Sequence, residues 1–197
     1  CFGKATSTAE IYTPRLTVNA ASLLITAGST NKVYGTTLGP TAYTVSGLLN
    51  SDSVTNVTLN SAGSVSNAAV GAYAITASLA SGSGLTNYTV GYSNGLLTVN
   101  AASLLITAGN TNKVYGTTLN PADYTVTGLL NSDSVTNVTL NSAGSVSNAP
   151  AGTYPITVTN AVGAGLSNYA IAYVNGLLTV NAANLLITAG NTNKVYG

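Results

Sequence analysis

The chain has 197 residues, of which only 5% are charged, and its formal net charge is +1. Five scattered cations cannot form the basic patch that nucleic-acid binding needs, and one cysteine without any histidine excludes an internal disulfide, a Cys/His metal cluster and a Ser–His–Asp triad. Because Val, Leu, Ile and Tyr are abundant and charge is low, the chain is expected to fold, without metal or cofactor.

One long repeat organises the chain. The lysines of three "NKVYG" segments, Lys32, Lys113 and Lys194, are spaced by 81 residues. A period of this length is too long for a solenoid unit and close to the size of a small domain, so it predicts domains in tandem. We predict the C-terminal end of a preceding, partly divergent repeat at 1–20, β repeat 1 at 21–101, β repeat 2 at 102–182, and the N-terminal start of a third repeat at 183–197.

Alternation of polar and apolar residues with period two predicts β-strands in both repeats. It is clear in "VTNVTL" at 54–59, in "YPITV" at 154–158 and in "LLTVN" at 96–100. The segments 47–53 and 60–67 are expected to be turns, with a single helical turn as an alternative for the first. We expect five or six strands in each repeat and little helix.

Two local features make sharper predictions. Asn94-Gly95, repeated as Asn175-Gly176, is typical of a type I′ turn and predicts a β-hairpin over 87–99. Pro155 stands where the first repeat has Ala74. Since proline cannot donate to a β-ladder, we predict that its strand lies at a sheet edge.

The connection between the full repeats contains no flexible linker. In 95–109, "GLLTVN" runs through "AA" directly into "SLLITAG", whereas a flexible tether would be rich in Gly and Ser or in Pro. We therefore predict an extended and stiff connection. The same segment is shorter than the ~20 residues of a membrane-spanning helix and is interrupted by Thr and Asn, so no span is predicted.

Four segments follow one another in repeat 2, and repeat 1 has similar segments in the same order: "KVYG", "YTVTGLLNSDSVTNVTL", "GTYPIT" and "GLSNYAIAYVNGLLTVN". Together they resemble the MBG-type (YGX-type) repeat of very large bacterial surface proteins, including filamentous-haemagglutinin-like adhesins. The resemblance covers both full repeats and both partial ones. It implies small, mostly β domains, β-grasp-like or β-sandwich-like, arranged end to end as a rod outside the cell. It implies no catalytic residues.

The few charged residues suggest two alternatives. Lys32 and Lys113 recur, as do Asp52 and Asp133. The first alternative is an intramolecular Lys–Asn isopeptide bond, known in other bacterial stalk proteins, with the aspartate assisting. The second, which we favour, is a lysine stem on apolar surface with its head in water or near the aspartate. One recurring aspartate falls short of a glycosidase pair or a calcium loop, so we predict no catalytic, cofactor-binding or metal-binding residue.

Tyrosines recur at 34, 43, 73, 88 and 92, and again 81 residues later. An exposed set of tyrosines would suit a sugar-stacking face. However, the tyrosines at 43, 73, 88 and 92 share the alternation of their apolar neighbours. We therefore expect most of them to pack in the core with their hydroxyls at its edge.

These features predict a non-enzymatic segment, a stiff stalk or fibre of an adhesin-like protein that is extracellular or at the cell surface. One alternative is a self-assembling filament or sheath subunit joined by β-strand pairing. The other is a glycan- or host-protein-binding module acting by avidity. The expected partners are neighbouring repeats, identical chains in a filament, and a glycan or host surface. Cys1 is interpreted as an ordinary residue, with a lipidated N-terminal cysteine as the alternative.

Overall fold

The computed structural model describes residues 15–197, and the predictions for Cys1 and the rest of 1–14 lie outside this part of the chain. Within it, repeat 1 contains β1 (Ala21–Ala27), β2 (Thr30–Val33), β3 (Tyr43–Ser46), β4 (Ser53–Asn60), β5 (Gly71–Ser83), β6 (Tyr88–Ser93) and β7 (Gly95–Asn100). Repeat 2 contains β8 (Ala102–Ala108), β9 (Thr111–Val114), β10 (Tyr124–Thr127), β11 (Ser134–Asn141), β12 (Gly152–Ala164), β13 (Tyr169–Val174) and β14 (Gly176–Asn181). Short 3-10 turns lie at Ala62–Ser64, Leu85–Asn87, Ala143–Ser145 and Leu166–Asn168.

The strands of each repeat form two sheets around one core. In repeat 1 the sheet orders are β3-β1-β6 and β2-β7-β5-β4, and repeat 2 has the equivalent sheets β10-β8-β13 and β9-β14-β12-β11. Ile25 on β1, Ile75 on β5 and Leu97 on β7 are all 0% exposed and belong to one cluster, so both sheets contribute to the core. The prediction of tandem, mostly β domains is confirmed, and of the two alternatives the structure shows the sandwich.

The predicted hairpin at Asn94-Gly95 is wrong. β6 runs parallel to β1 in one sheet, whereas β7 lies between β2 and β5 in the other. The glycine is required by close packing rather than by a positive φ, because a Cβ on Gly95 would collide with the carbonyl oxygen of Gly28. The chain therefore changes sheets at this point. Each repeat has seven strands rather than the expected five or six.

Of two further local predictions, the turn at 47–53 is correct although its helical alternative is wrong, and the prediction of an edge strand for Pro155 is wrong. In 47–53 the Asp52 N–H donates to the Leu49 carbonyl at 2.9 Å, and both residues between them have positive φ. This is a tight β-turn and not a helical turn. Pro155 lies on β12, which is an interior strand. However, the pairing of β12 with β11 begins only at Thr157, so at the proline β14 is the one paired neighbour.

A bulge interrupts β5 where it pairs with β4. The register shifts there, and Leu79 takes a φ of 49° while 76% of its surface is exposed. The N–H of the next residue, Ala80, donates instead to the Tyr92 hydroxyl at 3.1 Å. Repeat 2 has the same bulge, but Asn160 replaces the leucine, with a φ of 52°.

We expect the change Leu79→Asn to stabilise repeat 1. A leucine in the left-handed region costs about 1 kcal/mol more than an asparagine, whose short polar side chain tolerates it. The exposed leucine contributes little burial in return. The urea midpoint of unfolding should therefore rise, and the reverse change, Asn160→Leu, should lower it by a similar amount. Equal midpoints for both variants and the parent would contradict this interpretation of the bulge.

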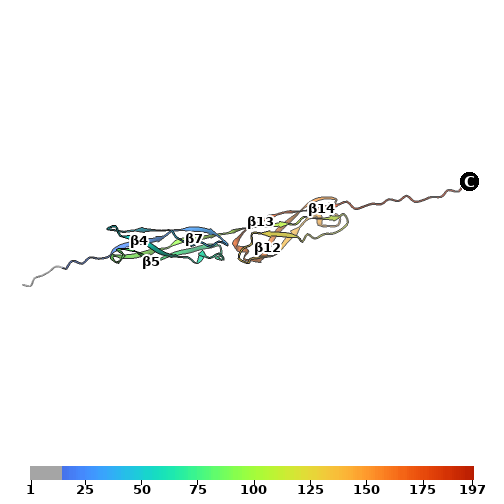
Figure 1. The fold of residues 1–197 in the computed structure, drawn as a ribbon. Coiled ribbons are helices and arrows are strands. Elements are labelled where there is room, and N and C mark those ends of the chain that lie inside the picture. The colour runs from blue at the N-terminus through green and yellow to red at the C-terminus, as the bar shows by residue number, and fades with distance from the viewer. Residues whose placement is uncertain (1–14) are drawn as a thin grey trace, which may run out of the picture.

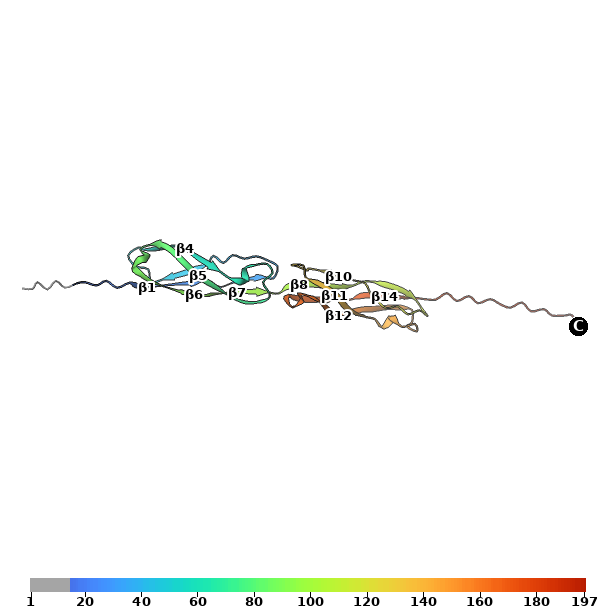
Figure 2. The same cartoon turned by 90° about the horizontal axis from the view of Figure 1, so that it is seen from below.

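The two repeats follow one another along a common axis, and two perpendicular views show the same narrow outline (Figures 1 and 2). Only Ala101 separates β7 from β8. The exposed segment 182–197 extends from one end of this rod, and it contains no strand. Leu185 is 84% exposed there, whereas its counterpart Leu104 on β8 is 1% exposed. In residues 15–197 no helix is long and apolar enough to cross a membrane.

Candidate functional site

The described residues contain no group of three or more His, Cys, Asp or Glu that could hold a metal ion. The polar side chains that are most specifically placed lie instead where the two repeats meet. We call this contact the joint. It is built from loops that follow β2 and the 3-10 turn Ala62–Ser64 in repeat 1, and from loops next to β11 and β13 in repeat 2.

Tyr34 is the central residue on the repeat 1 side of the joint. Its N–H donates to the Asn100 carbonyl at 2.8 Å, which extends the pairing of β2 with β7 and fixes the backbone. Its hydroxyl donates to Asp133 Oδ2 at 2.8 Å, and its ring meets the Tyr169 ring edge to face at 5.5 Å. Tyr34 is 3% exposed, whereas its counterpart Tyr115, which faces no repeat, is 47% exposed. The contact between repeats therefore accounts for the burial.

Asp133 is the central residue on the repeat 2 side. The Tyr169 hydroxyl donates to the same oxygen, Oδ2, at 2.8 Å, so one carboxylate oxygen accepts two phenols from different repeats. The Leu130 N–H donates to the Tyr169 oxygen at 2.8 Å and holds the turn in place. A Cβ on Gly165 would collide with the carboxylate, which explains the glycine. Burial, and then the hydrogen bond to Asp133, raise the pKa of Tyr169 to about 12.

Three smaller contacts complete the joint. The Asn131 side-chain amide donates to the Ser66 carbonyl at 3.0 Å, and the Val70 N–H donates to Asn168 Oδ1 at 3.0 Å. The Leu130 side chain occupies the space that a Cβ on Gly35 would need. We define the tyrosine face as Tyr34, Gly35, Ser66 and Val70, and the aspartate face as Leu130, Asn131, Asp133, Asn168 and Tyr169. The core of repeat 2 continues across this contact, since its cluster includes Tyr34, Ala68 and Val99.

Neither alternative for the recurring lysine, an isopeptide bond to asparagine or a head in water or near the aspartate, describes the contacts that its ammonium makes. Lys32 is 5% exposed, and its ammonium donates to the carbonyl of Thr36 at 2.7 Å and to the carbonyl of Val65. These acceptors are backbone atoms, so the head is shielded from water, and its hydrogen bonds go neither to Asp52 nor to an asparagine side chain. The lysine ties together the two loops that carry the tyrosine face. Burial lowers the pKa of Lys32. Lys113 makes the equivalent contacts.

The prediction for the tyrosines is correct in part. Tyr88 is buried, Tyr43 and Tyr73 are half-buried, and Tyr92 is 42% exposed. The hydroxyl of Tyr92 accepts the N–H that the bulge in β5 leaves free, so this tyrosine has a structural partner. Alternation along strands could not identify Tyr34 as the most buried of the set. Its burial depends on the neighbouring repeat.

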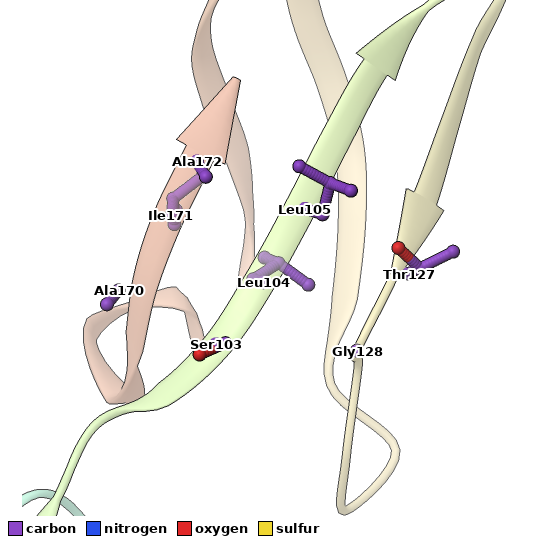
Figure 3. Close-up of a pocket in the computed structure, with 8 residues that line it drawn as sticks. All are labelled: Ser103, Leu104, Leu105, Thr127, Gly128, Ala170, Ile171 and Ala172. Carbon is purple, nitrogen blue, oxygen red and sulfur yellow. The ribbon is translucent and has the colours of Figure 1, made fainter. Parts of the chain in front are cut away.

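A hollow of about 630 Å³ lies elsewhere, on the three-stranded sheet of repeat 2 (Figure 3). Figure 3 shows short aliphatic and small side chains from β8, β13 and β10 around it. None of its lining residues is charged or aromatic, so the hollow lacks the stacking ring and the ionic hydrogen-bond partners typical of a sugar site. Repeat 1 has an equivalent hollow of about 460 Å³. The geometry of these hollows therefore gives no support to a glycan site.

Alkaline conditions are expected to destabilise the protein between about pH 10 and about pH 12. Tyr169 has an ordinary pKa of 10.0 when unfolded and a pKa of about 12 in the folded chain. Its contribution to stability is therefore complete below pH 10 and is lost as pH rises through this window. The free energy of unfolding in urea, measured across the window, should fall less steeply in Tyr169→Phe. An equal slope in both proteins would contradict the assignment.

Tandem β-sandwiches with a one-residue connection and a polar joint define a class of repeated structural domains. The chain belongs to the family of the MBG domain (YGX type), whose model matches residues 23–98 and 104–179. Domains of this family are found in surface proteins and are in general structural rather than catalytic. A comparison with curated proteins gives no match.

The "KVYG" segment acquires a physical explanation from the joint. Lys32 braces the two loops, Tyr34 bonds to the next repeat, and Gly35 leaves room for Leu130. Gly35 also has a φ of 89°, which favours glycine.

Proposed function

We propose that this chain is a non-enzymatic, stiff segment of an extracellular, adhesin-like bacterial surface protein, which holds other parts of that protein away from the cell. The observation that carries the proposal is the joint. A one-residue connection leaves little backbone freedom, and Tyr34 and Asp133 form a partly buried hydrogen bond across it. Domains of one chain move relative to each other unless such an interface opposes the motion.

Low charge also suits an extended support. Interactions between exposed charges weaken as salt rises, whereas the joint depends on one partly buried carboxylate and on neutral partners. The orientation of the repeats should therefore change little with ionic strength.

Distances between spin labels test the stiffness directly. Nitroxides can be placed at the exposed counterparts Thr44 and Thr125, each changed to cysteine in a Cys1→Ser chain. A stiff joint gives one narrow distance distribution that is the same at low and high salt. A Gly-Ser insertion after Ala101 serves as the flexible control and should broaden the distribution. A parent chain as broad as this control would overturn the proposal.

A further inference from the structure

The end of repeat 1 that faces away from repeat 2 carries a second, open copy of the aspartate face. Its residues are Leu49, Asn50, Asp52, Asn87 and Tyr88, each 81 positions before a residue of the joint. Together with Val18, Asn19, Ala20, Ala21 and Thr86 they line a hollow of about 370 Å³. This hollow in repeat 1 therefore corresponds to the place on repeat 2 that Tyr34 occupies in the joint.

The polar groups in the open copy have the same arrangement as in the joint. The Tyr88 hydroxyl donates to Asp52 Oδ2 at 2.9 Å, and the Leu49 N–H donates to the Tyr88 oxygen at 2.7 Å. The corresponding distances in the joint are 2.8 Å and 2.8 Å. The open face is thus already built, since its turn and its tyrosine make the same contacts as their counterparts in the joint.

Within residues 15–197, the open copy lacks the donor that Tyr34 supplies in the joint. Asp133 Oδ2 accepts two phenols, whereas the structure gives Asp52 Oδ2 one. Leu49 is 54% exposed, while its counterpart Leu130, which packs on Gly35, is 37% exposed. A partner that fits must therefore present a phenol to Asp52 and a glycine to Leu49.

We propose that the open aspartate face binds the tyrosine face of another repeat of the same kind. The occupant is defined by the interface that this chain already contains, because the two faces are complementary at every contact of the joint. The inference deepens the proposed function and rests on it. It also gives a rule for pairing: a tyrosine and glycine from the upstream repeat meet an aspartate and tyrosine from the downstream repeat.

Repeat 2 presents the matching tyrosine face at the far end of the rod. Tyr115 is 47% exposed there, and a Cβ on Gly116 would meet nothing within 4 Å. Lys113 braces the loops of this face through the carbonyls of Thr117 and Val146, as Lys32 does in the joint. Each two-repeat unit therefore carries one face of each kind at its two ends, so the contact can propagate in one direction.

The test inserts one more copy of residues 21–101 after Ala20 of the full chain, which keeps the spacing of 81 residues. Hydrogen exchange is then followed at 49–52 of the original repeat 1. One added hydrogen bond to a carboxylate should slow exchange there about tenfold. In a matched chain, the inserted counterpart of Tyr34 is changed to Phe, and the slowing should disappear. The change Tyr115→Phe at the unjoined face should have no effect.

Unchanged exchange at 49–52 in the lengthened chain would overturn the inference. Slowing in the parent chain that rises with its concentration would support it, since the tyrosine face of a second molecule would then be the occupant. The spin labels at Thr44 and Thr125 separate this outcome from failure of the proposed function. Narrow label distances with unchanged exchange would reject only the inference, whereas broad distances would reject the stiff segment itself.

Discussion

Replacing Asp133 with alanine is expected to loosen repeat 1 as well as repeat 2, although the aspartate lies in repeat 2. The change removes the acceptor of two phenols, Tyr34 and Tyr169. At about 1.5 kcal/mol for each hydrogen bond to a charged group, the loss should be about 3 kcal/mol. The same change at Asp52 removes the acceptor of one phenol, Tyr88, and should cost about half as much.

Hydrogen exchange shows which segments lose protection. In Asp133→Ala, amides of 30–36 and 64–70, which carry the tyrosine face, should exchange faster. In Asp52→Ala, repeat 2 should remain as protected as in the parent. Because Asp133→Ala also weakens repeat 2, Tyr34→Phe provides a milder variant that removes only the bond across the joint. If neither Asp133→Ala nor Tyr34→Phe changes exchange in the partner repeat, the joint does not couple the two domains.

Replacing Lys32 with methionine is the second change with a large expected effect. Methionine keeps an unbranched apolar stem in the buried position but leaves the carbonyls of Thr36 and Val65 without their donor. Each hydrogen bond from the charged ammonium contributes about 1.5 kcal/mol, so we expect a loss of about 3 kcal/mol in the free energy of unfolding. Urea denaturation measures this loss directly.

Lys113→Met is the matched control. Lys113 makes the same two contacts, but its loops form the tyrosine face that meets no repeat. Both variants should lose similar stability, whereas only Lys32→Met should also broaden the distance distribution between labels on the two repeats. Identical label distributions in the two variants would show that the lysine stabilises its own domain without shaping the joint.

The sequence was sufficient for the fold class because that information is local and repeated. Alternation in segments such as "VTNVTL" predicts strands, and the constant spacing of Lys32 and Lys113 predicts tandem domains. Partner choice between strands is not local. Asn94-Gly95 has the residues of a tight turn, but the neighbouring β1 makes this glycine part of a crossing between sheets.

The sequence does not identify the residues of the joint, for a related reason. In a tandem repeat, a tyrosine can pair with the recurring aspartate of its own repeat or with that of the next repeat. Tyr34 precedes Asp52 in its own repeat and Asp133 in the next, and sequence spacing does not distinguish the two pairings. Lys32 was misassigned because a buried lysine without a carboxylate is rare. Its acceptors are backbone carbonyls, which leave no mark in the side-chain sequence.

The parallel pairing of β2 with β7 determines how a repeat responds to a mechanical load. The chain enters a repeat through β1 at one end of the rod and leaves through β7 at the other. Tension between the two ends therefore acts along the strands and shears the evenly spaced, slanted hydrogen bonds between the parallel pairs. Such bonds share the load and must break together rather than one after another. The sandwich is thus oriented to resist pulling in the direction in which an anchored fibre would be stretched.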